Sequence, residues 1–253
     1  MVTLADSGAV TITFAGSGDA FGSGGRFQAC IHLRQPAGPP VLLDCGASSL
    51  AALKRCDLDP GEVAAVFVSH LHGDHFGGLP FLILDGQFSH RTRPLAVIGP
   101  PGTRKRLRAA MECLFPGSSA TRRRFAVEVI ELAPGSTGEA AGVQVTAWAA
   151  DHPSGAPALS LRLSVDGKVI GYTGDTAWTD SLAEVAAAAD VLIAEAYYRE
   201  KAVPYHLRLI DLDQHRAELA SHQIVLTHMS ADMLAADQQP GYQAASDGLI
   251  LRI

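Results

Sequence analysis

A short apolar strand that ends in a run of metal-binding side chains is the strongest constraint in this sequence. Residues Val63 to Ser69 are apolar and β-rich, and the segment SHLHGDHFGG (69–78) begins where they end. Four potential ligands lie within six positions: His70, His72, Asp74 and His75. Their spacing is not that of one helix face, so we predict a loop that leaves a buried strand, with Gly73 giving the backbone room to turn. Imidazole and carboxylate are good ligands for zinc.

One loop cannot place ligands on all sides of an ion, so the cluster predicts partners from elsewhere in the chain. Three candidates follow apolar strands: His152 in AADHPSG, Asp175 in GYTGDTAW and His228 in IVLTHMS. A purely structural zinc site usually has four protein ligands on one ion and is often rich in cysteine. A larger set of ligands without cysteine favours a catalytic site that keeps positions open for water and substrate.

Short apolar runs alternate with helical patterns along the chain, which predicts an α/β fold with two similar halves and one domain over residues 1–253. The predicted strands are Val10–Ala15, Phe27–Leu33, Val41–Asp44, Val63–Ser69, Leu95–Ile98, Val127–Leu132, Val143–Ala149, Leu159–Val165, Val169–Thr173, Val191–Ala196, Ile224–Thr227 and Leu249–Ile253. The predicted helices are one around Leu50 and Leu53, then Leu79–Leu84, Pro101–Leu114, about Asp180–Ala189 and about Leu212–His222.

The glycine-rich segment GSGDAFGSGG (16–25) contains a pattern similar to the GxGxxG of nucleotide-binding loops. Such loops hold phosphate at the N-terminus of a helix that follows them. Here RFQACIHL continues as a strand, so we do not expect a dinucleotide site.

The charge of the chain is unevenly distributed. The formal net charge is −6, which argues against a general nucleic-acid-binding protein. Residues 91–124 nevertheless carry a single acidic residue, Glu112, and nine basic ones: Arg91, Arg93, Arg104, Lys105, Arg106, Arg108, Arg122, Arg123 and Arg124. Such a basic face can attract a small anionic substrate or a short nucleic acid, or it can be only a solvated helix surface.

Nothing in the sequence indicates a membrane or an oxidising compartment. The start, MVTLADSGAVTITF, has no basic region followed by an apolar run, so no secretory signal is expected, and no apolar stretch is long enough to span a bilayer. Four cysteines are scattered without a CxxC pair: Cys30, Cys45, Cys56 and Cys113. We therefore expect reduced thiols in a cytoplasmic protein.

HLHGDH, a later lone histidine, a Gly-Asp-Thr and a late histidine after an apolar strand together resemble the metallo-β-lactamase superfamily of hydrolases. The resemblance implies a four-layer αββα sandwich with two metal ions, zinc with manganese or iron as alternatives, at one edge of the sheets. It implies that one ion is held by His70, His72 and His152. It also implies that the second is held by Asp74, His75 and His228, with Asp175 bridging both.

Two ions that share a water lower its pKa towards neutrality, and the resulting bridging hydroxide is the nucleophile. The ions also neutralise charge that develops on the attacked group. Asp74, as a ligand beside this water, could also accept its proton.

Several segments resemble the ribonuclease Z and small-phosphodiesterase branch of the superfamily, among them VIGPPGT (97–103), IAEAYY and PYHLRL. Members carry a glutamate and a histidine beside the metals, in a His-Glu-Ala-Thr element and a later His-x-Ser/Thr element. Glu195 matches the glutamate and His206 the histidine by position. An imidazolium held by Glu195 could stabilise phosphoryl oxygens or protonate a leaving alkoxide.

The sequence also departs from that branch. Ala194 replaces the histidine of the first element, and Arg208 replaces the Ser/Thr of the second. The long arm that ribonuclease Z uses to hold transfer RNA has no room between His152 and Asp175. We therefore expect a phosphodiesterase for a small phosphodiester or cyclic nucleotide. A lactonase or thioesterase and a ribonuclease acting on RNA 3′ ends remain alternatives, and the resemblance also suggests a homodimer.

Overall fold

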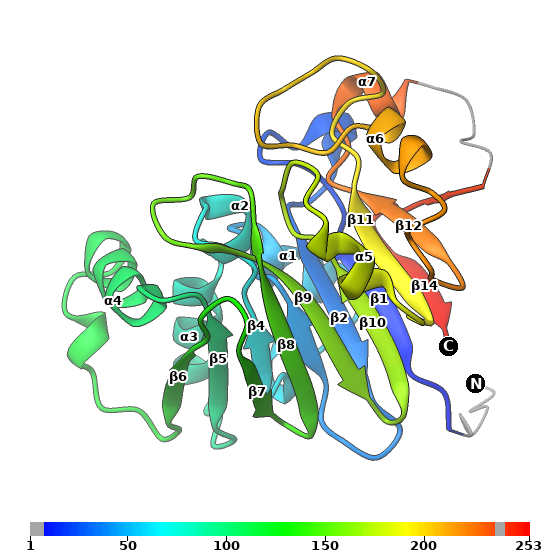
Figure 1. Cartoon of the computed structure of the whole chain (residues 1–253). Coiled ribbons are helices and arrows are strands. Elements are labelled where there is room, and N and C mark those ends of the chain that lie inside the picture. The colour runs from blue at the N-terminus through cyan, green and yellow to red at the C-terminus, as the bar shows by residue number, and fades with distance from the viewer. Residues whose placement is uncertain (1–7, 236–240) are drawn as a thin grey trace.

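Within the part of the chain that the structure describes, two sheets of seven strands each form the centre of the protein (Figure 1). The computed structural model describes residues 8–235 and 241–253. The first sheet contains, in spatial order, β14 (Leu249–Arg252), β1 (Thr11–Gly16), β2 (Cys30–Arg34), β3 (Val41–Leu43), β4 (Ala65–Phe67), β5 (Leu95–Gly99) and β6 (Val127–Glu131). The second contains β13 (Gln243–Ala244), β12 (Ile224–Thr227), β11 (Val191–Glu195), β10 (Lys168–Tyr172), β9 (Ala158–Val165), β8 (Val143–Ala150) and β7 (Thr137–Ala140).

The two sheets have the same pattern of strand directions. In the first, β14, β1, β2 and β3 pair antiparallel, and β3 to β6 pair parallel. In the second, β7 to β10 pair antiparallel, and β10 to β13 pair parallel. Apart from β14, which returns from the C-terminal half to pair with β1, each half of the chain therefore builds one mixed sheet, as the repeated pattern in the sequence predicts.

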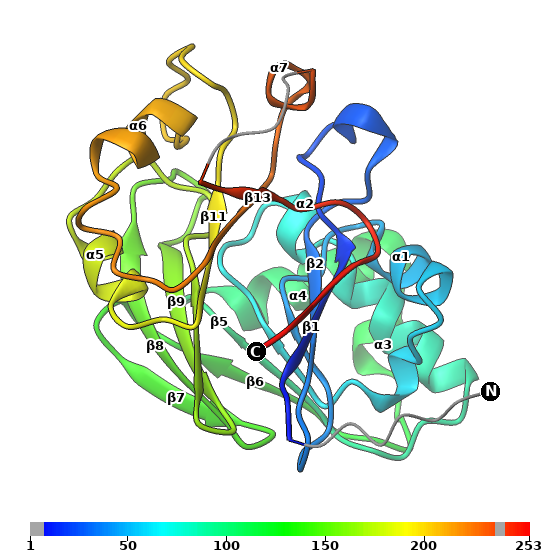
Figure 2. The same cartoon turned by 90° about the vertical axis from the view of Figure 1, so that its right-hand side faces the viewer.

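Helices cover the outer face of each sheet (Figure 2). The helices are α1 (Ser49–Arg55), α2 (Gly73–Phe76), α3 (Leu79–Phe88), α4 (Thr103–Leu114), α5 (Ser181–Ala186), α6 (Leu209–Gln214) and α7 (Ala231–Leu234), with three short 3-10 turns at Ser23–Gly25, Pro60–Glu62 and Ser118–Ala120. Apolar side chains fill the space between the sheets and the space between each sheet and its helices. This arrangement is the predicted αββα sandwich. No helix in the described ranges is long and apolar enough to cross a membrane.

Local patterns misplaced two helical segments. The histidine motif is not all loop, because α2 begins at Gly73 and holds Asp74 and His75 on one helical turn. Gly73 is not needed for a turn, since it lacks a positive φ and an added Cβ would meet nothing within 4 Å. The helix predicted over Leu212–His222 was also wrong: α6 ends at Gln214, and the chain then runs through turns to β12.

The glycine-rich segment joins two strands, as predicted. A Cβ on Gly16 would lie 1.9 Å from the Gln28 carbonyl oxygen, so glycine is required there by close backbone approach. The glycines of this segment therefore allow two chain segments to pack, and β2 rather than a helix follows them.

Two sequence expectations fall partly outside the described residues. The argument against a secretory signal uses residues 1–7. The turn-like composition of Gln238–Asp247 predicts a turn-rich segment, of which residues 238–240 lie outside the described ranges. None of the four cysteines forms a disulfide; Cys30 and Cys45 are buried, whereas Cys113 is exposed.

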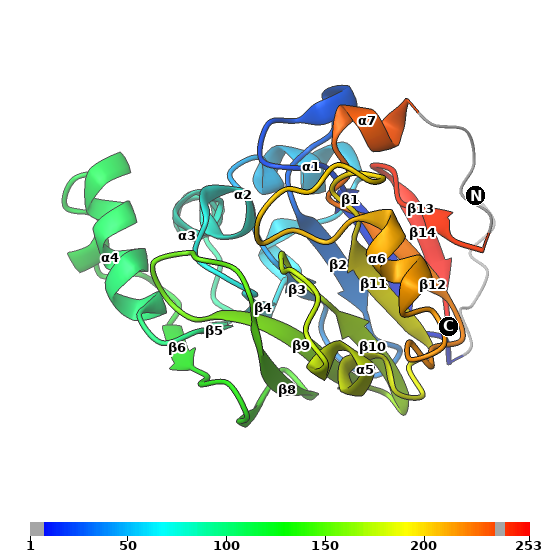
Figure 3. The ribbon, with the colours of Figure 1, turned by 45° about the horizontal axis from the view of Figure 1, so that its top comes forward.

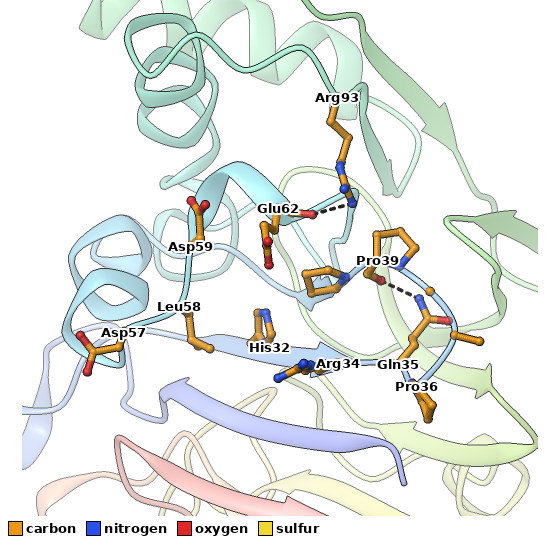
Figure 4. A pocket seen from close by; sticks show the side chains of 13 residues that line it. His32, Arg34, Gln35, Pro36, Pro39, Asp57, Leu58, Asp59, Glu62 and Arg93 are labelled. Atoms are coloured by element: carbon orange, nitrogen blue, oxygen red, sulfur yellow. Dashed lines mark hydrogen bonds between the residues drawn. The ribbon is translucent and has the colours of Figure 1, made fainter. Parts of the chain in front are cut away.

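A polar cavity of about 630 Å³ lies at the end of β2 that is remote from the histidine motif (Figure 4). The ring of His32 points from the strand into this cavity, and the residue is 5% exposed. Burial and then the positive charge of Arg34 lower the pKa of His32 to about 4, from its ordinary value of 6.5. The folded protein therefore holds this imidazole neutral well below neutral pH.

We predict that His32 makes the folded state less stable in mild acid. Because its folded-state pKa is below the unfolded value, the unfolded chain binds the proton first, and the free energy of unfolding falls as pH drops from about 6.5 to about 4. Between about pH 7.5 and pH 5 the wild type should lose about 2 kcal/mol more than His32→Gln, measured by urea unfolding. The exposed-site control His222→Gln should behave as wild type, and identical pH slopes for all three proteins would contradict this account.

Candidate metal centre

The candidate site residues lie at or just beyond the carboxyl ends of strands from both sheets. Parallel strands present these ends at one edge of a sheet, where α/β proteins commonly bind ligands. The strand and residue pairs are β3 with Asp44, β4 with His70, β8 with His152, β10 with Asp175, β11 with Glu195 and β12 with His228. The sandwich brings these ends together, so residues far apart in sequence form one site.

Three histidines form the first cluster. Their ligand atoms lie within 4.8 Å of one another: His70, His72 and His152. The Nε2 atom of His152 is 3.0 Å from Nδ1 of His72, and the Nδ1–H of His152 can donate to the Tyr205 carbonyl oxygen at 3.0 Å. That second contact fixes the tautomer, so the Nε2 lone pair of His152 is available to a cation.

Two carboxylates and two histidines form the second cluster, again with ligand atoms within 4.8 Å: Asp74, His75, Asp175 and His228. The Oδ2 atom of Asp74 lies 3.2 Å from Nε2 of His75 and 3.1 Å from Nε2 of His228. All four residues are buried. The structure therefore brings together the residues that the sequence analysis grouped, and it places Asp175, the expected bridge, with the second cluster.

Asp175 lies between the two clusters. Its Oδ1 is 3.2 Å from Nε2 of His75, and its Oδ2 is 4.0 Å from Nε2 of His70. Gly174 precedes it with φ +58, and a Cβ there would come within 3.0 Å of both the Leu159 carbonyl oxygen and the Ser69 side chain. A glycine is thus needed to bring Asp175 against the end of β4.

Asp44 is a site residue that sequence reasoning did not single out. Its buried carboxylate accepts hydrogen bonds from Ser69 Oγ at 2.7 Å, Tyr172 Oη at 2.7 Å and the Nδ1–H of His75 at 2.7 Å. The bond to His75 fixes its tautomer and leaves its Nε2 facing Asp74 and Asp175. The available signal was an aspartate at the end of the apolar strand Val41–Leu43.

Two of these residues have strained backbones. Asp44 has φ +57 and His228 has φ +55, values that non-glycine residues rarely adopt and that cost about 1–3 kcal/mol each. Their buried hydrogen bonds and ion pairs keep them in place. Strain of this kind is typical of functional sites.

The buried carboxylates of the second cluster favour the binding of a cation. Burial favours the neutral forms, but Asp175 and Asp74 outweigh it and raise the pKa of His228 to about 10 and that of His75 well above its usual value. In the first cluster, burial lowers the pKa of His70 and of His72, so both rings stay neutral. The buried carboxylates thus favour positive charge in the second cluster, whereas the first cluster offers the lone pairs of neutral imidazoles.

Unpartnered buried atoms show that the residues fit metal ions. Within the described ranges, Nε2 of His70, Nε2 of His75 and Oδ1 of Asp175 are buried without a hydrogen-bond partner. Buried polar atoms normally have a hydrogen-bond partner, and a bound metal ion is one explanation for buried atoms that have none. Histidine and carboxylate donors suit zinc, manganese and iron.

Glu195 and His206 lie together next to the second cluster. His206 Nδ1 hydrogen-bonds to Oε1 of Glu195, and the same oxygen is 3.3 Å from Nδ1 of His228. The other carboxylate oxygen accepts from the backbone N–H groups of Thr176 at 3.0 Å and Leu207 at 3.2 Å. Burial disfavours the imidazolium of His206, but the hydrogen bond to Glu195 raises its pKa.

The basic residues do not act as one surface. Arg91 is buried and donates to the backbone carbonyls of Val63 and Pro94, so its role is structural. Arg208, which stands at the Ser/Thr position of the second element, pairs with Asp211 at the start of α6. Arg106 of α4 lies near Gly155, three residues after His152, and so places a basic side chain beside the loop of that ligand. Figure 3 shows α4 beside α2 and α3.

The two-sheet fold with metal-binding clusters at one edge defines a hydrolase of the metallo-β-lactamase superfamily. Human tRNase Z, short form, superposes with a TM-score of 0.78 at 25% identity, covering 95% of this chain and 98% of that one. A diphosphatase from the PhnP family shares the fold, with a TM-score of 0.75 at 19% identity over 96% and 97% of the two chains. Ribonuclease Z of Anoxybacillus flavithermus is 25% identical over 277 residues, covering 87% of this chain and 86% of that protein.

A second ribonuclease Z, from Methanosarcina acetivorans, is 31% identical over 152 residues, which span 60% of this chain and 47% of that protein. The predicted ribonuclease Z and phosphodiesterase branch is thereby confirmed. The chain belongs to the Anti-Pycsar protein Apyc1 family, whose model matches residues 10–245.

We predict that Asp44 maintains metal affinity by holding His75. Asp44→Asn should weaken metal binding in the second cluster by about 10- to 100-fold, because the outer hydrogen bond of a ligand histidine is lost. Competition with a fluorescent zinc chelator measures this directly. Tyr172→Phe removes another hydrogen bond to the same carboxylate and leaves His75 in contact, so it should change the affinity far less. Equal losses in both variants would show a general packing effect instead.

Proposed function

We propose that this protein is a binuclear metal-dependent phosphodiesterase acting on a small phosphodiester such as a cyclic nucleotide. One divalent ion, zinc by preference, would be held by His70, His72 and His152. A second would be held by Asp74, His75 and His228, and Asp175 would bridge them. Within the described residues the donor clusters, their separation and the position of Asp175 between them support this assignment.

The pairing of His206 with Glu195 is the observation that carries the proposal. A carboxylic-ester hydrolase could use the metal clusters alone, whereas an alkoxide leaving from phosphorus benefits from a proton donor. Asp175, Glu195, His206 and His228 also have ligand atoms within 4.8 Å of one another. Since Glu195 and His206 hydrogen-bond directly, we assign this pair to proton transfer rather than to a further ion.

The proposed mechanism moves protons between these side chains. When bound, the two ions would lower the pKa of a water and neutralise charge on the phosphoryl oxygens. Histidine contacts outweigh the effect of burial and hold the pKa of Asp74 below its usual range, so Asp74 is ionised. We assign this carboxylate to accept the proton of the attacking water because of its place among the proposed ligands. Glu195 holds Nδ1 of His206, and the opposite nitrogen, Nε2, donates its proton to the leaving oxygen.

The short connection between His152 and Asp175 favours a small substrate. Between His152 and Asp175 the chain forms only the antiparallel pair β9 and β10, without the long arm that would hold transfer RNA. A second candidate, a ribonuclease acting on RNA 3′ ends, is favoured by Arg106 near the loop of His152 and by the relatives named ribonuclease Z.

We also expect this chain to act as one domain over residues 1–253, in the cytoplasm and as a homodimer. Each of these expectations comes from the sequence and its family resemblance. Light scattering of the purified, metal-loaded protein measures the oligomeric state.

A substrate panel tests the proposal. Metal-replete protein is assayed with bis(4-nitrophenyl) phosphate, cyclic nucleotides, an RNA with a 3′ extension, a lactone and a β-lactam, and its metal content is measured. Phosphodiester turnover with two ions per chain is the expected result. Lactone turnover without phosphodiester turnover would overturn the phosphodiesterase proposal, and RNA trimming without cyclic-nucleotide turnover would favour the ribonuclease.

We predict that the need for His206 increases with the basicity of the leaving group. His206→Ala should reduce kcat/KM for a nucleoside leaving group by about 100-fold or more, but much less for 4-nitrophenolate, which departs without a proton. Glu195→Gln should show the same trend, with metal content measured in parallel because Glu195 also neighbours His228. His222→Ala is the matched exposed-histidine control. Equal losses for all leaving groups would rule out proton donation by His206.

A further inference from the structure

Tyr197 lies beside the Glu195–His206 pair and has no assigned role. Its ring centroid is 4.7 Å from that of His206 and 5.8 Å from that of His228. The rings of His206 and His228 are stacked at 6.0 Å with an interplanar angle of 10°. Tyr197 therefore borders the space between a proposed metal ligand and the proposed proton donor.

Backbone hydrogen bonds hold Tyr197 in this position. Its N–H donates to the Leu207 carbonyl oxygen at 2.9 Å, and its own carbonyl oxygen accepts from the N–H of Ser230 at 3.0 Å. Leu207 follows His206 directly, and Ser230 comes two residues after His228. The segments that carry the two histidines are thus tied to Tyr197, and its ring has a fixed relation to both.

The Tyr197 hydroxyl is available to a substrate. It forms no hydrogen bond with another part of the described chain, and the residue is only partly buried. The carboxylates of Asp19, Glu195 and Asp175 lie near enough to add to the effect of burial and raise the pKa of this phenol. A phenol is already protonated at neutral pH, so it can donate a hydrogen bond without adding negative charge to an acidic site.

The path of the reaction places phosphorus next to this residue. Attacking and leaving oxygens lie roughly in line in phosphoryl transfer, and the other oxygens of the phosphoryl group point sideways from that line. Here the line would run from the carboxylate-rich cluster of Asp74 and Asp175 towards His206. Tyr197 stands beside this line because its ring neighbours both His228 and His206.

We propose that Tyr197 is a catalytic residue whose hydroxyl donates a hydrogen bond to a non-bridging phosphoryl oxygen of the phosphodiester. This inference rests on the proposed phosphodiesterase function and adds a neutral donor to it. No proton is transferred by Tyr197: the leaving oxygen takes its proton from His206, and the phenol remains hydrogen-bonded to the phosphoryl oxygen throughout the step.

Tyr197→Phe tests the proposal, because it removes the hydroxyl and keeps the ring. We expect kcat/KM to fall about ten-fold, the scale of one hydrogen bond to a charged group, by the same factor for bis(4-nitrophenyl) phosphate and for a cyclic nucleotide. Binding of inorganic phosphate to the metal-loaded protein, measured by calorimetry, should weaken by about five-fold or more. Tyr198→Phe, the same change at the next residue, should stay within two-fold of wild type in both measurements.

Two results would overturn the proposal. One is a Tyr197→Phe variant, with wild-type metal content and melting temperature, that matches the wild type in turnover and in phosphate binding. The other is a loss of turnover that grows with leaving-group basicity, as for His206→Ala, which would assign the hydroxyl to the leaving oxygen. Failure of the phosphodiesterase function is distinguishable, since the wild type would then cleave no phosphodiester, and phosphate binding alone would decide the role of Tyr197.

Discussion

Negative charge buried where the two sheets meet governs the architecture of this site. Asp74 and Asp175 are 7% and 3% exposed, and an isolated carboxylate so deep in a protein would cost several kcal/mol. His75 and His228 lie beside these carboxylates, which raise the pKa values of both histidines. Divalent ions would meet the same electrostatic requirement as those protons and would also use the free lone pairs of the first cluster.

A second layer of contacts keeps the ligand side chains in orientation. Asp44 holds His75, the Tyr205 carbonyl holds His152, and Glu195 stands against His228 while it binds His206. Each contact engages one ring nitrogen and leaves the other facing the centre, which is how outer hydrogen bonds tune a metal site. The left-handed backbones of Asp44 and His228 are tolerated because these contacts over-determine them.

The sequence predicted strands well where apolar runs were buried on both faces, as in β4, β11 and β12. It missed β7, because TGEA has neither apolar alternation nor buried residues. It predicted a helix over about Leu212–His222, whereas α6 ends at Gln214 and turns lead from there towards β12. It grouped nine basic residues that the fold separates, with Arg91 inside the protein and Lys105 and Arg108 exposed.

The sequence alone determined the ligand types and the strands that precede them, since both are local: an apolar run followed by histidine or aspartate is visible without a fold. Tertiary structure decided which ligands share an ion site and which neighbours orient them. His72 meets His152 across 80 positions and Asp74 meets His228 across 154. No local pattern shows that Asp44 would hold His75 or that Tyr197 would lie beside His206. Such contacts depend on how two sheets pack face to face, and no short stretch of sequence records that packing.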